Sequence, residues 1–119
     1  ERGALQLGIL LQLFINPFKG YPENMRMITD PAIKETVKEF AQLEGAFAID
    51  SNGIILTCGA YINVNTEHMN LPLGFGTKHR SCAALTQETD AIAVVVSASG
   101  GIVRVFKNGK PIIKLEPDV

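Results

Sequence analysis

The sequence predicts an α/β fold of the α+β kind: a single domain with a central mixed, largely antiparallel β-sheet flanked by helices. Short apolar stretches lie on both sides of an Asn-Gly turn at 52–53 and again at 108–109, which is typical of β-hairpins. Two other segments, after Asp30 and after Gly76, carry apolar residues at helical spacing. With 119 residues, 46% of them hydrophobic, the chain has room for one packed core and is too short for two domains.

The N-terminal part is predicted from its composition. Residues 4–15 are mostly apolar; their first half suits the end of a helix, and residues 10–15 suit a buried strand. We expect residues 1–9 to be peripheral to the domain. Because the chain begins at Glu1 without Met, we expect it to be a piece of a longer protein. Residues 16–24 contain Pro, Gly and Asn and are predicted to form a loop.

A first helix is predicted to begin at Asp30-Pro31, with Asp30 as the N-cap and Pro31 at the first helical position. The apolar side chains at helical spacing are expected to face the core: Ile33, Val37, Phe40, Ala41 and Leu43. The charged side chains between them are expected to be solvated: Lys34, Glu35, Lys38 and Glu39.

A β-hairpin is predicted next. Residues 45–50 and 54–58 are short apolar stretches, and residues 50–53 (Asp-Ser-Asn-Gly) between them form a tight turn. Residues 60–76 contain Asn, Thr, His, Pro and Gly and are predicted to form a long loop. A loop of this length in a compact domain is usually functional.

The C-terminal half is predicted to contain one helix and three strands. The helix runs from Thr77, a suitable N-cap, to about Glu88. Its inward-facing side chains are expected to include Cys82, Ala84 and Leu85. Residues 91–97 are predicted to form a buried strand, followed by strands at 102–106 and 111–115 that are joined by the second Asn-Gly turn.

Composition and charge exclude several classes of function. The net charge is -1, from 11 basic and 12 acidic residues, so we expect no nucleic-acid binding by this domain alone, and any anion site must be local. No apolar stretch approaches the roughly 20 residues of a membrane span. Cys58 and Cys82 are expected to be free thiols in a reducing compartment, which favours the cytoplasm. The cysteines and histidines do not cluster, which argues against zinc.

The segment from Gly74 to Ser81, Gly-Phe-Gly-Thr-Lys-His-Arg-Ser, predicts a phosphate site. A helix N-terminus carries partial positive charge and favours acidic residues, but this one carries Lys78, His79 and Arg80. Cations and free backbone N–H groups that converge there can bind a polyphosphate. The alternative is a capped helix with a solvated basic start. The segment is neither a Walker A loop nor a GxGxxG motif, so these residues alone indicate only a nucleotide or phosphoester site.

Three further features have open interpretations. Glu44-Gly45 at a helix-to-strand junction is either a helix end closed by glycine or a carboxylate that holds a divalent metal for a triphosphate. Residues 97–101 (Ser-Ala-Ser-Gly-Gly) are either an ordinary turn or a set of donors near phosphates. Arg104 alone is interpreted as a solvated or paired strand arginine.

These motifs resemble those of the diadenylate cyclase family (DAC, DisA_N). That family has Asp-Gly-Ala, then Gly-Thr followed by Arg-His-Arg, where this chain has Glu44 to Ala46 and Gly76 to Arg80, followed by a strand that ends at Ser97. The lead-in at 71–74 (Leu-Pro-Leu-Gly) and the strand at 91–97 are similar to the archaeal branch. The resemblance covers about residues 10 to 116.

The resemblance implies condensation of two ATP into the second messenger cyclic di-AMP, with release of two pyrophosphates and a requirement for Mn²⁺ or Mg²⁺. It also implies that two domains meet face to face in a homodimer or higher homo-oligomer, each binding one ATP. The alternative is a sensor module that binds ATP or cyclic di-AMP with weak or no turnover.

By the resemblance, the catalytic residues are Glu44, Gly45, Ala46, Lys78, His79 and Arg80, and the remaining ATP-binding residues are Leu71, Leu73, Gly76, Thr77, Ser81 and Ser97. Glu44 would hold the metal and assist deprotonation of the ribose 3′-hydroxyl. Glu44 replaces the family's Asp, and its extra methylene moves the carboxylate by ~1.5 Å, where catalysis is sensitive to about 1 Å. Lys78 replaces an arginine and loses bidentate geometry. Ala98 stands where some bacterial members have an acidic residue.

Overall fold

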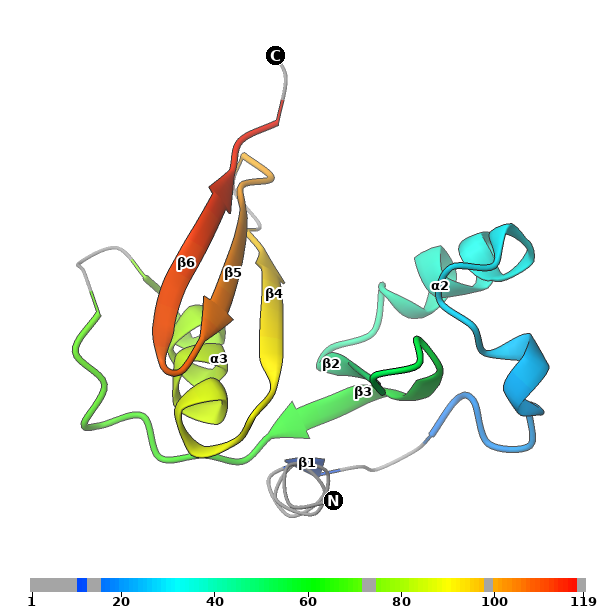
Figure 1. The fold of residues 1–119 in the computed structure, drawn as a ribbon, viewed down its shortest axis with the longest axis horizontal. Helices are drawn as coiled ribbons and strands as arrows, with labels where there is room; N and C mark the ends of the chain where they lie inside the picture. Colours follow the sequence, from blue (N-terminus) through cyan, green and yellow to red (C-terminus); the bar gives the residue numbers. More distant parts are fainter. Residues whose placement is uncertain (1–10, 13–15, 72–74, 98–99, 118–119) are drawn as a thin grey trace. The chain divides into compact units, whose positions relative to one another are not determined.

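A computed structural model describes residues 11–12, 16–71, 75–97 and 100–117 (Figure 1). It divides into two compact units, Leu11–Tyr61 and a second unit that contains the chain from Ile62 onward. The strands form two three-stranded sheets, with strand orders β1-β3-β2 and β4-β5-β6. Helices accompany antiparallel strand pairs in both units, so the predicted α+β class is confirmed.

The first unit contains all elements up to the end of the first hairpin: β1 (Leu11–Gln12), the 3₁₀ turns η1 (Glu23–Met25) and η2 (Pro31–Ile33), α2 (Lys34–Phe40), β2 (Ala46–Ile49) and β3 (Ile55–Ile62). The predicted helix start is confirmed, because the Asp30 carboxylate accepts a hydrogen bond from the backbone N–H of Ala32 at 3.0 Å. The first helical turn is 3₁₀ and α-helical geometry begins only at Lys34.

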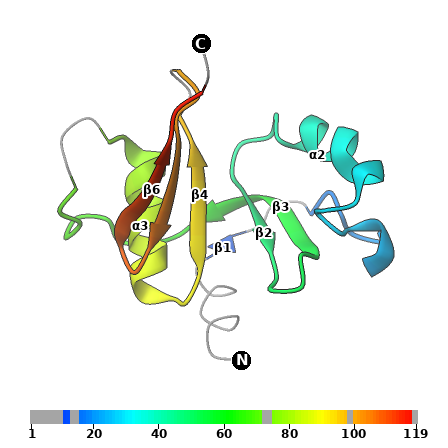
Figure 2. The same ribbon diagram turned by 45° about the horizontal axis from the view of Figure 1, so that its top comes forward.

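The predicted β2–β3 hairpin is confirmed (Figure 2). Its turn is held by the Asp50 carboxylate, which accepts hydrogen bonds from the N–H groups of Asn52 (2.9 Å) and Ile54 (3.0 Å). Gly53 adopts φ +84°, which a residue with a side chain rarely adopts. The strand β3 continues through Ile62, so the predicted loop begins three residues later than expected.

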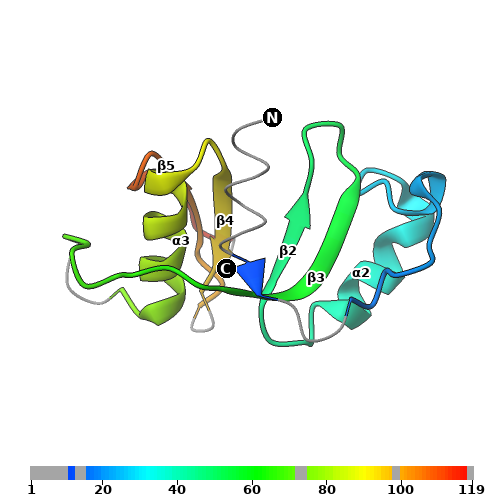
Figure 3. The ribbon, with the colours of Figure 1, turned by 90° about the horizontal axis from the view of Figure 1, so that it is seen from below.

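The first core forms where α2 packs beside β3 (Figure 3). Phe18, Ile33, Ile55 and Cys58 are buried, and Val37 and Phe40 from α2 pack against them. Phe18 makes edge-to-face contacts with Phe40 (5.0 Å between ring centroids) and with Tyr21 (5.4 Å). The predicted core stripe is wrong at its end. Ala41 and Leu43 are exposed because α2 ends at Phe40 and the chain leaves the helical path there.

The second unit consists of one helix and three antiparallel strands: α3 (Thr77–Glu88), β4 (Ile92–Val96), β5 (Val103–Lys107) and β6 (Lys110–Leu115). The β4–β5 ladder is regular, with Val95 opposite Arg104 and Val96 opposite Val103. Asn108 and Gly109 both have positive φ, as the predicted Asn-Gly hairpin turn requires. The helix α3 lies against one face of this sheet (Figures 1 and 3).

The second core lies between α3 and its sheet. Its buried residues are Cys82, Ala83, Val95 and Phe106. The prediction of free thiols is confirmed: Cys82 here and Cys58 in the first core are both free and buried. The predicted burial of the whole strand at 91–97 is wrong. In the described structure Ile92, Val94 and Val96 are more than half exposed, because α3 covers only the face that carries Ala93 and Val95.

Among the described residues, no helix has both the length and the apolar character needed to cross a membrane.

Candidate functional site

The first turn of α3 carries the predicted phosphate-binding residues, but its cap differs from the prediction. Gly76 is the N-cap, with an extended backbone (φ -85°, ψ -172°), and Thr77 is the first helical residue. Thr77 is therefore not the predicted N-cap, because its backbone is already helical. No side chain caps this end of the helix. The first N–H groups of α3 thus lack the partner that a capping side chain supplies, and they can donate to an anion.

Lys78 joins this turn to the end of the neighbouring strand. Its Nζ donates a hydrogen bond to the carbonyl oxygen of Val96 at 2.7 Å. Val96 is the last residue of β4, and Ser97 follows it, with its N–H bonded to the carbonyl of Ile102 at 2.8 Å. Predicted phosphate ligands from α3 and from the end of β4 therefore lie together in the second unit. The Lys78 ammonium is exposed and keeps two further protons for other acceptors.

His79 is buried beside these cations. It is 8% exposed, its ring stacks on Phe75 (5.2 Å between centroids, 22° between planes), and it meets Phe106 edge-on at 6.2 Å. Its Nε2 is buried and has no hydrogen-bond partner in the described structure. Burial lowers the pKa of His79 below its ordinary value, and the charges of Arg104 and Lys78 lower it further. A neutral imidazole with an unsatisfied ring nitrogen is costly to bury unless a water molecule or a bound group completes it.

Arg80 is the second strong cation of the turn. Its backbone N–H bonds to the carbonyl of Gly76 at 3.1 Å, and its Nη1 makes a long contact of 3.4 Å with the carbonyl of Met69. Arg80 and Ser81 are half-buried. A β-carbon added at Gly76 would meet no atom within 4 Å, so the approach to this turn is open there.

Of the two leucines that the resemblance assigns to ATP binding, only Leu71 lies in the described part of the structure. Leu71 is half-buried and packs against the second core. Leu73 lies outside the described residues, as do Ala98 and Ser99 after β4.

The site has basic groups without acidic partners. Within the described ranges, ion pairs form only between Lys38 and Glu35 and between Lys114 and Glu116. Lys78, Arg80 and Arg104 therefore form none. A cluster of cations that no carboxylate neutralises repels itself, and it gains stability when an anion binds.

Glu44 and Gly45 lie in the connection between α2 and β2 of the other unit, and Ala46 is the first residue of β2. Glu44 is exposed, and the helix ends four residues before it, so Gly45 does not close α2. Gly45 adopts φ +102°, and a β-carbon there would lie 2.6 Å from the carbonyl carbon of Gly59 and 2.7 Å from the oxygen of Ala60. The close approach of the β2 and β3 backbones therefore requires glycine at this position. This structural role was not foreseen from the sequence.

The donor set at Glu44 suits a metal that arrives with its nucleotide. In the described part of the chain, no three residues of the Asp, Glu, His and Cys types cluster as a metal cage, and Glu44 pairs with no basic residue. Mg²⁺ is usually held by one or two carboxylates together with substrate phosphates rather than by a dedicated cage. A single exposed carboxylate fits that mode of binding.

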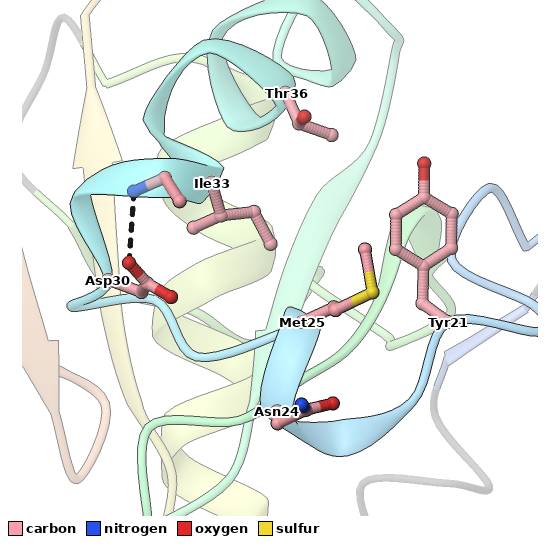
Figure 4. A pocket seen from close by; sticks show the side chains of 7 residues that line it. Tyr21, Asn24, Met25, Asp30, Ile33 and Thr36 are labelled. Carbon is pink, nitrogen blue, oxygen red and sulfur yellow. Dashed lines mark hydrogen bonds between the residues drawn. The ribbon is translucent and has the colours of Figure 1, made fainter.

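A hollow in the first unit is a poor candidate for the nucleotide. It measures about 120 Å³ and is lined by Tyr21, Asn24, Met25, Asp30, Ala32, Ile33 and Thr36 (Figure 4). Ligand pockets usually have volumes of about 300–1,000 Å³. No cationic side chain lines the hollow, and the Asp30 carboxylate beside it already serves as a helix cap.

The sequence did not show that Arg104 lies near the cations of α3. Arg104 is half-buried and has no ion-pair partner in the described structure, so the paired alternative of its interpretation is wrong. Its guanidinium carbon lies 4.8 Å from the ring centroid of Phe75. The available signal was strand alternation, because Arg104 and Phe106 are two residues apart and therefore face the same side of β5.

Comparison with known proteins places these motifs in a family. The family model described as "DisA bacterial checkpoint controller nucleotide-binding" (DAC) matches residues 14–111. A protein of Methanocaldococcus jannaschii named "Diadenylate cyclase" is 40% identical over 105 residues, which are 88% of this chain and 33% of that protein. A Haloferax volcanii protein of the same name is 37% identical over 106 residues, which are 89% of this chain and 38% of that protein.

The chain thus spans 33% and 38% of the lengths of these two curated relatives. The matched region includes both predicted motifs, Glu44 to Ala46 and Gly76 to Arg80. On the extent of the family match and the identity to both archaeal proteins, the chain belongs to the DAC (diadenylate cyclase) family.

Proposed function

We propose that this chain is a nucleotidyltransferase domain that condenses two ATP into cyclic di-AMP and releases two pyrophosphates. The observation that carries the proposal is the first turn of α3. It combines N–H groups that no side chain caps, Lys78 and Arg80 without acidic partners, and a buried His79 whose Nε2 has no partner in the described structure. Family membership and the names of the two archaeal relatives support ATP as the anion.

The chemistry needs charge stabilisation more than a protein nucleophile. In each step a ribose 3′-oxygen attacks the α-phosphorus of the other ATP, the bond to pyrophosphate breaks, and the hydroxyl proton leaves to a base. Negative charge builds on the phosphoryl oxygens and on the departing pyrophosphate. Cations and backbone N–H groups fixed beforehand at the start of α3 stabilise that charge without reorganising during the reaction. In this proposal Lys78 and Arg80 would supply the charge.

The other residues would bind and position the nucleotide. Gly76, Thr77 and Ser81 offer backbone and hydroxyl donors beside the cations, and Ser97 adds a donor at the end of β4. Leu71 and Leu73 would flank adenine, and Ala46 would lie close to the ribose. Glu44 would accept the 3′-hydroxyl proton and hold a divalent ion. Mn²⁺ or Mg²⁺ bound there with ATP supplies Lewis-acid neutralisation of the phosphates.

The proposed reaction needs two copies of the domain. Each copy binds one ATP, and each ribose attacks the nucleotide held by the other copy. One chain therefore carries a half-site, and the active species is a homodimer or a higher homo-oligomer. The rate per chain should rise with protein concentration until the pairing saturates.

The test is direct detection of product. Purified protein is incubated with ATP and Mn²⁺ or Mg²⁺ over a wide range of protein concentrations, and cyclic di-AMP is measured by liquid chromatography with mass detection. Arg80→Ala is the negative control, with thermal melting to confirm that it folds. We expect metal-dependent product from the parent and at least tenfold less from the variant, since lost charge-assisted hydrogen bonds cost about 1.5–3 kcal/mol.

Two other results would count against the cyclase. Saturable ATP or cyclic di-AMP binding without product, little affected by Glu44→Ala, would indicate the sensor module instead. Neither binding nor product at any protein concentration would overturn the assignment of the nucleotide site itself.

A further inference from the structure

Arg104 lies on the same side of its sheet as the proposed phosphate site. It is the second residue of β5, and Phe106, two residues further, is fully buried under α3. Val95, the cross-strand partner of Arg104, is 2% exposed on the same face. Strand alternation therefore directs Arg104 toward α3 and away from the open face of the sheet.

The guanidinium is positioned by an aromatic ring. Its carbon lies 4.8 Å from the centroid of Phe75, and the same ring stacks on His79 at 5.2 Å. Phe75 also meets Phe106 edge-on at 6.1 Å, which anchors the ring to the core. The ring thus connects the cation on β5 with the imidazole in the first turn of α3.

The charge of Arg104 is not compensated by a carboxylate. Arginine keeps its proton under all ordinary conditions, so the charge persists, unlike that of His79. A cation–π contact satisfies none of the five N–H donors of the guanidinium. The described structure gives this half-buried guanidinium no ion-pair partner. The charges of Arg104 and Lys78 both lower the pKa of His79, so these two cations lie close to the same imidazole.

We propose that Arg104 is a further phosphate-binding residue of this site, with its guanidinium held against Phe75 and donating to phosphate oxygens of the nucleotide bound at the start of α3. The buried and unpartnered Nε2 of His79 is the independent sign that a ligand completes this region. The inference rests on the proposed nucleotide site, but it does not require turnover. It adds a ligand from β5 to those carried by the Gly76-to-Arg80 motif.

The test measures binding without reaction. The probe is 3′-deoxy-ATP, which lacks the attacking hydroxyl, and its Kd is measured by calorimetry for the parent, Arg104→Gln and Arg104→Lys. Lys107→Gln is the matched control, because it removes one positive charge from the opposite face of the same strand. We expect Arg104→Gln to raise Kd about tenfold, Arg104→Lys about threefold, and Lys107→Gln less than twofold, because Arg104→Gln removes the charged donor and Arg104→Lys only its planar geometry.

The outcomes separate this inference from the cyclase assignment. Unchanged binding by Arg104→Gln, or equal losses in Arg104→Gln and Lys107→Gln, would overturn the role of Arg104. If Arg104→Gln does not fold, the Kd of Arg104→Lys decides whether Arg104 binds phosphate, because lysine keeps the charge and the aliphatic chain but lacks the planar guanidinium. If the parent makes no cyclic di-AMP, but the Arg104 variants bind 3′-deoxy-ATP more weakly and Lys107→Gln does not, the role of Arg104 is supported and turnover is rejected. A parent that does not bind the probe would reject both.

Discussion

The ammonium of Lys78 donates to the carbonyl oxygen of Val96 at 2.7 Å and so fastens the first turn of α3 to the last residue of β4. Lysine has three donors, and this bond uses one of them. The contact brings two candidate phosphate ligands, the Lys78 ammonium and the backbone that leads into Ser97, to one place. The ammonium is oriented by a fixed carbonyl and keeps donors for an anion, so in the proposed function lysine would serve where the family has arginine.

Replacing Lys78 with methionine should weaken ATP binding about tenfold, because it removes a charge-assisted interaction worth about 1.5–3 kcal/mol. Lys78 is exposed, so the free energy of unfolding should change by less than about 1 kcal/mol. Calorimetric titration with ATP and urea denaturation measure the two quantities. Lys107→Met is the control on the opposite face of the sheet. Equal loss of affinity in both variants would show that only overall charge matters.

The sequence was sufficient for elements whose signals are local. Asp30-Pro31 predicted where the first helix begins, and the two Asn-Gly turns predicted the hairpins. Each of these features depends only on the φ values and hydrogen bonds of a few neighbouring residues. The strand at 91–97 shows the limit of this reasoning. Its apolar residues alternate between a face that α3 covers and a face that it does not, and only tertiary packing decides which face is buried.

The candidate site was predictable in part for the same reason. Lys78, His79 and Arg80 are contiguous, so their convergence at a helix N-terminus could be inferred. Arg104 could not be joined to them, because it is 24 positions from Arg80 and reaches Phe75 only through the pairing of β5 with β4. The predicted N-cap of α3 was wrong by one residue, because Gly76 takes the extended conformation that Thr77 was expected to adopt.

Replacing Gly45 with alanine should destabilise the protein strongly. The new β-carbon would lie 2.6 Å from the carbonyl carbon of Gly59, at a backbone φ of +102°. Strain at such a φ costs about 1–3 kcal/mol, and overpacking adds about 1–3 kcal/mol. Gly20→Ala is a matched control, because Gly20 has φ +92° but no atom within 4 Å of the added carbon. Urea denaturation should show a loss for Gly45→Ala that exceeds the Gly20→Ala loss by at least about 1 kcal/mol. Equal losses would show that the backbones of β2 and β3 can move apart.

His79 should titrate at a lower pH than an unperturbed histidine. Burial, with the charges of Arg104 and Lys78, lowers its pKa from the ordinary 6.5, so the folded protein takes up this proton at lower pH than the unfolded chain does. The contribution of His79 to stability is therefore fully present above pH 6.5 and is lost as the pH falls from 6.5 toward the lowered pKa. The chain has two histidines, so NMR titration of the imidazole Cε1 protons can follow both, with His68→Gln to assign them.

The same titration tests the cause of the shift. Arg104→Gln removes one of the neighbouring charges and should move the His79 midpoint upward, while Lys107→Gln should leave it unchanged. A His79 midpoint at or above the ordinary 6.5 in the parent would contradict the burial of His79 beside these cations.

Thr86 should prove to be the polar link between α3 and the turn from β5 to β6. It is fully buried, its Oγ1 donates to the carbonyl of Ala83 at 3.0 Å, and it accepts from the N–H of Gly109 at 3.1 Å. Valine has nearly the same shape but leaves that N–H buried without a partner, so Thr86→Val should lower the free energy of unfolding by about 1–3 kcal/mol. Thr77→Val, at an exposed position, should change it by less than about 0.5 kcal/mol.

Hydrogen exchange distinguishes this link from simple packing. In Thr86→Val, the Gly109 amide should exchange faster than the other amides of the β5–β6 hairpin, because only that donor loses its acceptor. Thr86→Ser keeps the hydroxyl and loses one methyl group, so it should retain the protection of Gly109 even though some stability is lost. If Gly109 remained protected in Thr86→Val, another group would have to accept its hydrogen bond, and the link would be one of packing alone.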